Sequence, residues 1–179
     1  LDGGEFSSIV VKHVQPGRGA HPRGWNTDLS HQRKLKSYQV ETNWYDSQKN
    51  NAGDNLARIP VCFGTQREGD EVFLILEDLD ASDFAGRRSL VNQSEWKSCV
   101  RWLAAFHTQY LGVAPEGLWE NGTYWHLETR PDELERLDDH SLKKAASAID
   151  AKLKTNKFQT LVHGDAKLAN FCFSSNGSE

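Results

Sequence analysis

The sequence predicts an α+β protein in which a small β-rich part with one long helix precedes a helical part. Two observations lead to this class. Short β-branched and aromatic runs gather in the first 77 residues, and later apolar residues recur at the helical spacings of three and four. The stretch between them is polar and irregular. We therefore expect an N-terminal part at 1–77, a hinge or linker at 78–90 and a C-terminal part at 91–179.

The N-terminal part is predicted to alternate strands with one long helix. A β-branched run follows Asp2-Gly3-Gly4, a sequence typical of hairpin turns. Asp28 or Ser30 is a suitable N-cap for the helix. The expected elements are a strand at 6–14, a loop at 15–27, a helix at 29–49, a strand at 59–63, a turn at 67–70 and a strand at 72–77.

The C-terminal part is predicted to be mostly helical. Ser94 can cap an amphipathic helix, and Pro131 suits the first turn of a short acidic helix. A later helix is expected to turn Leu142, Ile149 and Leu153 inward. The expected elements are helices from Ser94 to Leu111, from Pro131 onward and at 141–156, and short buried strands at 160–162 and 171–173 around a polar loop.

The composition of the 179 residues is that of a soluble globular protein, with 37% hydrophobic and 26% charged residues. A net charge of −4 without a Lys/Arg cluster argues against a nucleic-acid partner. No apolar run approaches the roughly 18 residues of a membrane span. Cys62, Cys99 and Cys172 are scattered and odd in number, which favours free thiols, and no signal peptide opens the chain. We expect a cytoplasmic protein. The sequence does not determine its oligomeric state.

The most informative stretch is 161–171, LVHGDAKLANF, in which Asp165, Lys167 and Asn170 share one loop between two apolar runs. A phosphoryl-transfer site needs a carboxylate to orient the attacking hydroxyl and accept its proton, a cation near the γ-phosphate and a neutral oxygen ligand for magnesium. On one tight loop these three side chains can converge on one point. We predict that His163 faces inward and holds the shape of the loop.

This loop resembles the catalytic loop of the protein-kinase-like fold, HxDxKxxN, in the HGD form that aminoglycoside phosphotransferases and choline kinases use. The resemblance implies an incomplete two-lobe fold, ATP and Mg²⁺ as cofactors, and a small-molecule hydroxyl as the acceptor. It makes Asp165 the catalytic aspartate, Lys167 the lysine of the same loop and Asn170 a magnesium ligand.

Upstream residues match further parts of the same family. Lys12, in the run VVKHV, matches the lysine that holds the α- and β-phosphates, and Glu41 matches its glutamate partner on the next helix. The run VFLILEDL at 72–79 resembles the strand that leads into the hinge, where the backbone around Glu77 and Leu79 would meet adenine. We predict that Lys12 and Glu41 form an ion pair beneath the nucleotide.

Finer similarities point to the choline-kinase-like group that includes ecdysteroid-kinase-like proteins. They lie in GWNTD at 24–28, in RKLKSYQVE at 33–41, in LEDLD at 76–80 and in VHGDAKLANF at 162–171. In this family a glycine-rich loop precedes the lysine strand, and a second magnesium aspartate follows the catalytic loop. Neither is found in this chain, which starts with Leu and contains no Met. We therefore expect a segment that is truncated at both ends and inactive by itself.

The aromatic stretch around Trp125 and His126 is the candidate substrate side. Trp119, Tyr124 and Trp125 can form a wall that binds a quaternary amine. They can equally seal this loop against the helices, which is the commoner use of aromatic side chains. The acceptor molecule is not identified by the sequence.

Other interpretations stay open on the sequence alone. Asp165 and Asn170 can simply close a turn. His163 and Asp165, with His107 or His126, can also form the metal site of a hydrolase, although no HxxxH or HExxH spacing is present. A non-catalytic pseudokinase or binding module is a further alternative. A Walker-type NTPase is not expected, because the sequence contains no GxxxxGK[ST].

Overall fold

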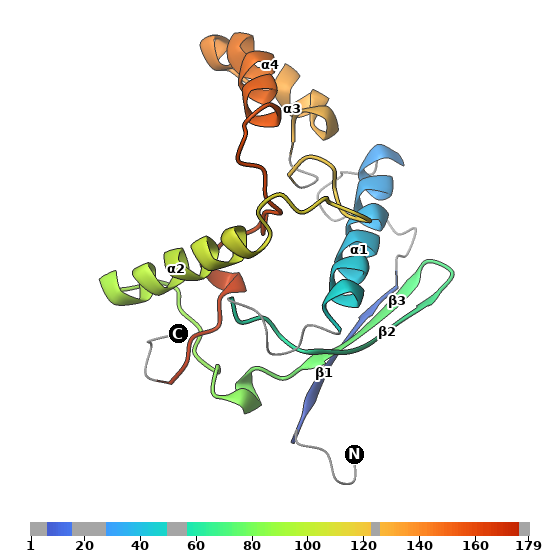
Figure 1. Cartoon of the computed structure of the whole chain (residues 1–179). Coiled ribbons are helices and arrows are strands. Elements are labelled where there is room, and N and C mark those ends of the chain that lie inside the picture. Colours follow the sequence, from blue (N-terminus) through green and yellow to red (C-terminus); the bar gives the residue numbers. More distant parts are fainter. Residues whose placement is uncertain (1–6, 16–27, 50–56, 123–125, 176–179) are drawn as a thin grey trace.

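The computed structural model of the chain describes residues 7–15, 28–49, 57–122 and 126–175. It is a mixed α and β structure in which a small sheet with one helix comes first and the other helices follow (Figure 1). The elements are β1 (Ile9–Val14), α1 (Asp28–Gln48), β2 (Cys62–Glu68), β3 (Glu71–Glu77), η1 (Asp80–Ser82), α2 (Gln93–Gln109), η2 (Leu127–Thr129), α3 (Pro131–Glu135), α4 (His140–Lys154) and η3 (Leu168–Asn170), where η marks a short 3₁₀-helix.

The sheet has three antiparallel strands in the order β1-β3-β2, with β3 in the centre. Strands β2 and β3 form a hairpin whose turn is Gly69-Asp70, and Gly69 has a φ of 59° that favours glycine. The strand predicted at 59–63 pairs antiparallel with β3 as expected, but its bounds are wrong, because β2 runs from Cys62 to Glu68. This strand lies at an edge of the sheet and is largely polar and exposed beyond Cys62, so no apolar run marks it.

Helix α1 packs on the sheet through an apolar cluster. Val72 and Leu74 of β3 are buried, and they form this cluster with Val14 of β1. Tyr38 and Tyr45 of α1 pack against it. In Figure 1 the helix lies along the sheet, as these contacts require. The contacts fix the position of the α1 face that carries Glu41.

A second apolar cluster joins α1 to α2. Phe106 of α2 and Tyr110, which follows the last residue of this helix, are buried with Ala57, and Trp44 of α1 packs against them. The ring centroid of Trp44 lies 5.6 Å from that of Phe106 and 5.1 Å from that of Tyr110. The Tyr110 hydroxyl also donates a hydrogen bond of 2.9 Å to Gln48. Helix α1 thus contacts both the sheet and the first helix of the C-terminal part.

The predicted strands at 160–162 and 171–173 are wrong. Thr160 forms an isolated bridge with Leu111, and Phe173 forms one with Gly86, so neither segment joins a sheet. Phe173 is deeply buried, and a Cβ on Gly86 would lie only 2.6 Å from its carbonyl oxygen. The two apolar runs are therefore anchored to loops rather than to strands. No described residue of 160–173 extends the sheet of β1, β2 and β3, and the division into two lobes stays a prediction.

The predicted helices of the C-terminal part are present, with two differences. Asn92 rather than Ser94 caps α2, and it forms a capping box with Glu95. On α4 the side chains of Leu142, Ile149 and Leu153 are exposed rather than inward. In Figure 1, α3 and α4 lie together, away from the sheet. Among the described residues, no helix has the length and apolar character needed to cross a membrane.

Candidate active site

The loop from His163 to Asn170 folds back on itself and brings its polar side chains together. Gly164 takes a left-handed φ of 77°, and the η3 turn returns the chain toward Asp165. The side-chain amide of Asn170 donates to the Asp165 carbonyl and to Asp165 Oδ2, both at 2.8 Å. Lys167 Nζ lies 2.9 Å from the same carboxylate oxygen. The convergence of the three side chains, predicted from their spacing, is confirmed.

Asp165 is held as an anion at the centre of this loop. The hydrogen bond from Lys167, together with the one from Asn170, keeps the pKa of the Asp165 carboxyl below its usual range. Its side chain is 61% exposed. An exposed carboxylate with a lowered pKa can accept a hydrogen bond from a hydroxyl and orient it throughout the neutral pH range.

His163 lies inward, as predicted. Its Nδ1 accepts the Asp165 backbone N–H at 3.2 Å, and its ring packs edge-on against Trp102 and Phe106. Burial lowers the pKa of this imidazole, and nearby His107 lowers it further, against the opposing effect of Asp165. A neutral His163 is the form that can accept the Asp165 N–H. This geometry fits the predicted role of His163 in shaping the loop.

The ion pair predicted between Lys12 and Glu41 is present. Lys12 Nζ on β1 lies 2.7 Å from both carboxylate oxygens of Glu41 on α1. The side chains are 41% and 33% exposed, so the pair is open to solvent on one side. A two-oxygen contact fixes the position of an otherwise flexible ammonium group.

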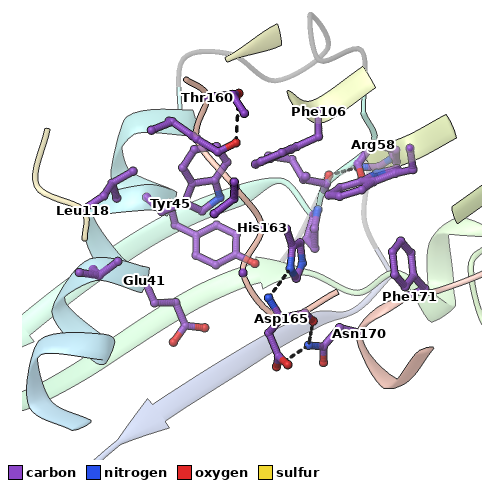
Figure 2. Close-up of a pocket in the computed structure, with 18 of the residues that line it drawn as sticks. Glu41, Tyr45, Arg58, Phe106, Leu118, Thr160, His163, Asp165, Asn170 and Phe171 are labelled. Atoms are coloured by element: carbon purple, nitrogen blue, oxygen red, sulfur yellow. Dashed lines mark hydrogen bonds between the residues drawn. The ribbon is translucent and has the colours of Figure 1, made fainter. Parts of the chain in front are cut away.

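One cleft of about 1500 Å³ joins this ion pair to the loop. Lys12, Glu41 and Leu79 line it together with side chains from 163–170. In Figure 2, Glu41 on α1 lies across the cleft from Asp165. Residues from opposite ends of the chain therefore share one site. A phosphate group held by a lysine at one side would lie within the same cleft as a hydroxyl held by Asp165.

Comparison with known families agrees with this geometry. A family model described as "Phosphotransferase enzyme family" matches residues 29–179. The chain belongs to the phosphotransferase enzyme family. The match includes Glu41 and the loop at 163–170 but begins after Lys12, so the placement of Lys12 depends on the ion pair and the cleft. No curated protein and no solved structure matches this chain.

Family membership and geometry together weaken the hydrolase alternative. A hydrolase metal site would need His107 or His126 beside His163. Neither His107 nor His126 lines the cleft. The backbone carbonyl of His107 accepts a hydrogen bond from Thr160 at 2.7 Å, which places this residue at a helix end. Of these three histidines, His163 is the one among the described residues that lines the cleft.

The structure gives less support to the residues predicted on the substrate side than to the loop and the ion pair. His126 lies near Trp119, with ring centroids 6.4 Å apart, and its Nδ1 is buried without a hydrogen-bond partner among the described residues. Trp119 lines the cleft, whereas His126 does not. Trp125 lies outside the described residues, as does Tyr124. Their roles at the substrate stay predictions.

Glu77 has a structural role that the sequence did not reveal. Its carboxylate is buried and accepts hydrogen bonds from Arg58 Nη2 at 2.5 Å and from the Val61 N–H at 3.0 Å. The carbonyl of Leu79 accepts the N–H groups of Ser82 and Phe84. The Glu77 side chain is therefore fully engaged, and any contact of this segment with adenine must come from its remaining backbone groups.

We expect Glu77→Gln to destabilise the protein by about 1.5–3 kcal/mol, the usual contribution of a hydrogen bond to a charged group. Burial raises the pKa of Glu77, but the bonds from Arg58 and Val61 lower it by more, so the folded-state pKa lies below the ordinary value. The stabilisation is then present above the unfolded-state pKa and is lost as the pH falls through the folded-state pKa. Urea unfolding of the wild type and of Glu77→Gln at several pH values measures this difference in the free energy of unfolding.

The matched control for this change is Glu68→Gln at the exposed end of β2. It removes the same charge from the same sheet and should alter the free energy of unfolding by less than about 0.5 kcal/mol. An equal effect of the two substitutions, or a Glu77→Gln effect that persists in acid, would contradict the role assigned to the buried pair.

Tyr45 and Arg58 line the cleft and were not predicted as site residues. Burial, with the nearby charge of Glu41, raises the pKa of Tyr45 to about 12, so the phenol stays neutral. Tyr45 lies four residues after Glu41 on α1, and this spacing places both on one helix face. That signal was available in the sequence. Arg58 follows a stretch without any local pattern, and nothing in the sequence indicates it.

Oxygen atoms suited to magnesium are present on the catalytic loop. The amide nitrogen of Asn170 bonds Asp165, which leaves its oxygen Oδ1 directed elsewhere. Carboxylate and amide oxygens are the ligands that Mg²⁺ prefers, and it usually keeps several waters and binds substrate phosphates as well. In the part of the chain that the structure describes, no group of three or more His, Cys, Asp or Glu side chains surrounds one point. The loop oxygen that could contribute to a cation bound together with a nucleotide is Asn170 Oδ1.

Proposed function

We propose that this protein is an ATP-dependent phosphotransferase that transfers the γ-phosphoryl group to a hydroxyl of a small molecule. The observation that carries this proposal is the single cleft lined by the Lys12–Glu41 pair and by the loop of Asp165 and Asn170. Membership of the phosphotransferase enzyme family supports it. The aminoglycoside phosphotransferases and choline kinases are the relatives whose chemistry fits, and the sequence resemblance favours an ecdysteroid-kinase-like subgroup.

On the acceptor side, Asp165 would act directly on the substrate. Its carboxylate accepts a hydrogen bond from the hydroxyl and aligns the oxygen with the γ-phosphorus. As the new O–P bond forms and the bond from phosphorus to the β–γ bridging oxygen breaks, the hydroxyl proton passes to Asp165 and ADP leaves. Lys167 beside Asp165 supplies positive charge for the transferring group.

On the nucleotide side, Lys12 would hold the α- and β-phosphates. Glu41 keeps the ammonium in the cleft and leaves it able to donate to phosphate oxygens. Leu79 lines the cleft at the end of the segment that follows β3. Because its carbonyl is already bonded to Ser82 and Phe84, its N–H is the group that would meet the adenine edge.

Asn170 Oδ1 would help to hold magnesium. When bound, the metal neutralises phosphate charge and keeps the phosphates in line with the acceptor. The chain's own contribution is the pair of hydrogen bonds from the Asn170 amide nitrogen to Asp165, which sets the direction of the Asn170 oxygen.

The proposed function is tested by ADP release from the full-length protein with ATP, Mg²⁺ and a panel of small alcohols. We expect Asn170→Ala to lower the rate by about 10- to 100-fold, as loss of groups that support a metal ligand typically does, and higher Mg²⁺ to restore part of it. Asn156→Ala, at an exposed position two residues after α4 and outside the cleft, should have the wild-type rate. ATP binding without turnover of any alcohol would favour the pseudokinase alternative instead.

A further inference from the structure

Trp102 of α2 contacts both ends of the catalytic loop. Its ring centroid lies 5.7 Å from that of His163 and 5.8 Å from that of Phe171, in edge-to-face geometry. On its other side it stacks on Phe106, with centroids 5.2 Å apart and planes 14° apart. His163 and Phe171 flank Asp165 and Asn170 in the chain, so one indole ring supports the loop where it begins and where it ends.

The indole N–H of Trp102 makes a separate contact with the nucleotide side. It donates a hydrogen bond of 2.7 Å to the carbonyl of Arg58, in the segment that leads into β2. Arg58 in turn bonds Glu77 at the end of β3 and lies over the ring of Phe84 at 5.6 Å. In Figure 2, Arg58 and Phe171 are drawn on the same side of the loop as His163. Trp102 thus touches the two parts of the chain between which the cleft lies.

The hydrogen bonds inside the loop cannot supply this connection. Asn170 bonds Asp165, Lys167 bonds Asp165, and the Asp165 N–H bonds His163, all within the same short segment. They fix the shape of the loop and leave its position relative to Lys12 undetermined. Phosphoryl transfer requires that position to be held closely, because misplacement by about 1 Å can cost on the order of 100-fold in rate.

We propose that Trp102 is a positioning residue that seats the catalytic loop with its ring and ties it to the nucleotide side with its N–H. This inference rests on the proposed function and adds a residue to it. The two contacts of the side chain have separate consequences. The ring governs the placement of Asp165 and therefore kcat. The N–H holds the position of Arg58 and, through the Arg58–Glu77 pair, the position of the end of β3. It therefore affects KM for ATP.

Two substitutions separate these consequences. Trp102→Leu removes the ring and the N–H, and we expect kcat to fall by about 10- to 100-fold with a weaker ATP affinity. Trp102→Phe keeps an aromatic ring beside His163 and Phe171 but removes the donor to Arg58. It should keep most of kcat and raise KM for ATP. The control is Trp96→Leu on the same helix, because Trp96 is 56% exposed and outside the cleft, and both parameters should be unchanged.

A titration of His163 by NMR gives a readout that does not need phosphoryl transfer. The charged and titratable groups that influence His163 are Asp165 on the loop and His107 on α2. Neither changes in Trp102→Leu, whereas removal of the indole ring gives the imidazole more water. The pKa of His163 should therefore rise toward its ordinary value in Trp102→Leu, stay low in Trp102→Phe, and be unaffected in Trp96→Leu.

The outcomes distinguish the two proposals. A wild-type protein that binds ATP but transfers no phosphoryl group overturns the proposed function, while the His163 titration still tests the seating of the loop. Trp102 has no positioning role if folded Trp102→Leu keeps the wild-type kcat and the wild-type His163 pKa. The assignment of kcat to the ring is overturned if Trp102→Phe loses as much kcat as Trp102→Leu.

Discussion

Asp165→Asn should reduce phosphoryl transfer by about 10²–10⁴-fold, the usual effect of losing a general base, while ATP affinity stays close to that of the wild type. The amide has nearly the size of the carboxylate but cannot accept the hydroxyl proton. In the proposed function, nucleotide binding depends instead on Lys12 and on the segment after β3, which line the other side of the cleft. Rates of ADP release and ATP binding by calorimetry, measured on the same preparation, separate the two effects.

The control for this prediction is Asp132→Asn on α3, which is exposed and outside the cleft. Its activity and melting temperature should match the wild type. In the wild type, the hydrogen bond from Lys167 lowers the pKa of Asp165, so we expect protonation of this carboxylate to reduce the rate only below the ordinary range of aspartate, about 3.9. Full activity of folded Asp165→Asn would mean that this loop is only a turn.

The shape of the loop at 163–170 was predictable because its contacts are local. Asp165, Lys167 and Asn170 interact across at most five positions, so their spacing alone implies that the side chains meet. The Lys12–Glu41 pair needed a different argument, since 29 positions separate the two residues. It was predicted from the order of a lysine strand and a following helix, and the register of β1 on β3 with α1 packed above makes the contact possible.

The errors arose where an apolar run was interpreted as a strand. Apolar periodicity reports burial, but it does not identify the hydrogen-bonding partner of the backbone. Leu161 is partly buried beside Phe106 of α2, and Phe173 is buried against Gly86, so each run packs through one side chain without joining a sheet. The converse error occurred at β2, where an exposed edge strand carries few apolar residues.

Contacts between distant loops were beyond prediction for a related reason. Arg58 reaches Glu77 and Trp102 only because the segment before β2 passes between the sheet and α2. No periodicity, cap or turn marks that passage. The same holds for Trp102 itself, which in the sequence is one apolar position among several on an amphipathic helix.

Lys12→Met should lower kcat/KM for ATP by about 10²–10³-fold, the range found when one preorganised donor to a developing charge is removed. The methionine keeps most of the apolar stem on β1 and removes the ammonium group. Because the Lys12–Glu41 pair is partly open to solvent, it contributes little to folding, at most about 1 kcal/mol. A large loss of function with little loss of stability is therefore the expected signature. Steady-state kinetics and urea unfolding measure the two quantities.

A control and a mutant cycle make this prediction specific. Lys49→Met removes another lysine that is paired to a carboxylate, Asp46 on α1, but lies outside the cleft, and it should leave kcat/KM unchanged. Glu41→Gln should cause a smaller loss than Lys12→Met, because the ammonium group stays but is held less firmly. If Glu41 acts only through Lys12, the double substitution is no worse than Lys12→Met alone. Additive losses would instead mean that the two side chains act independently, and the pair would then be only a surface contact.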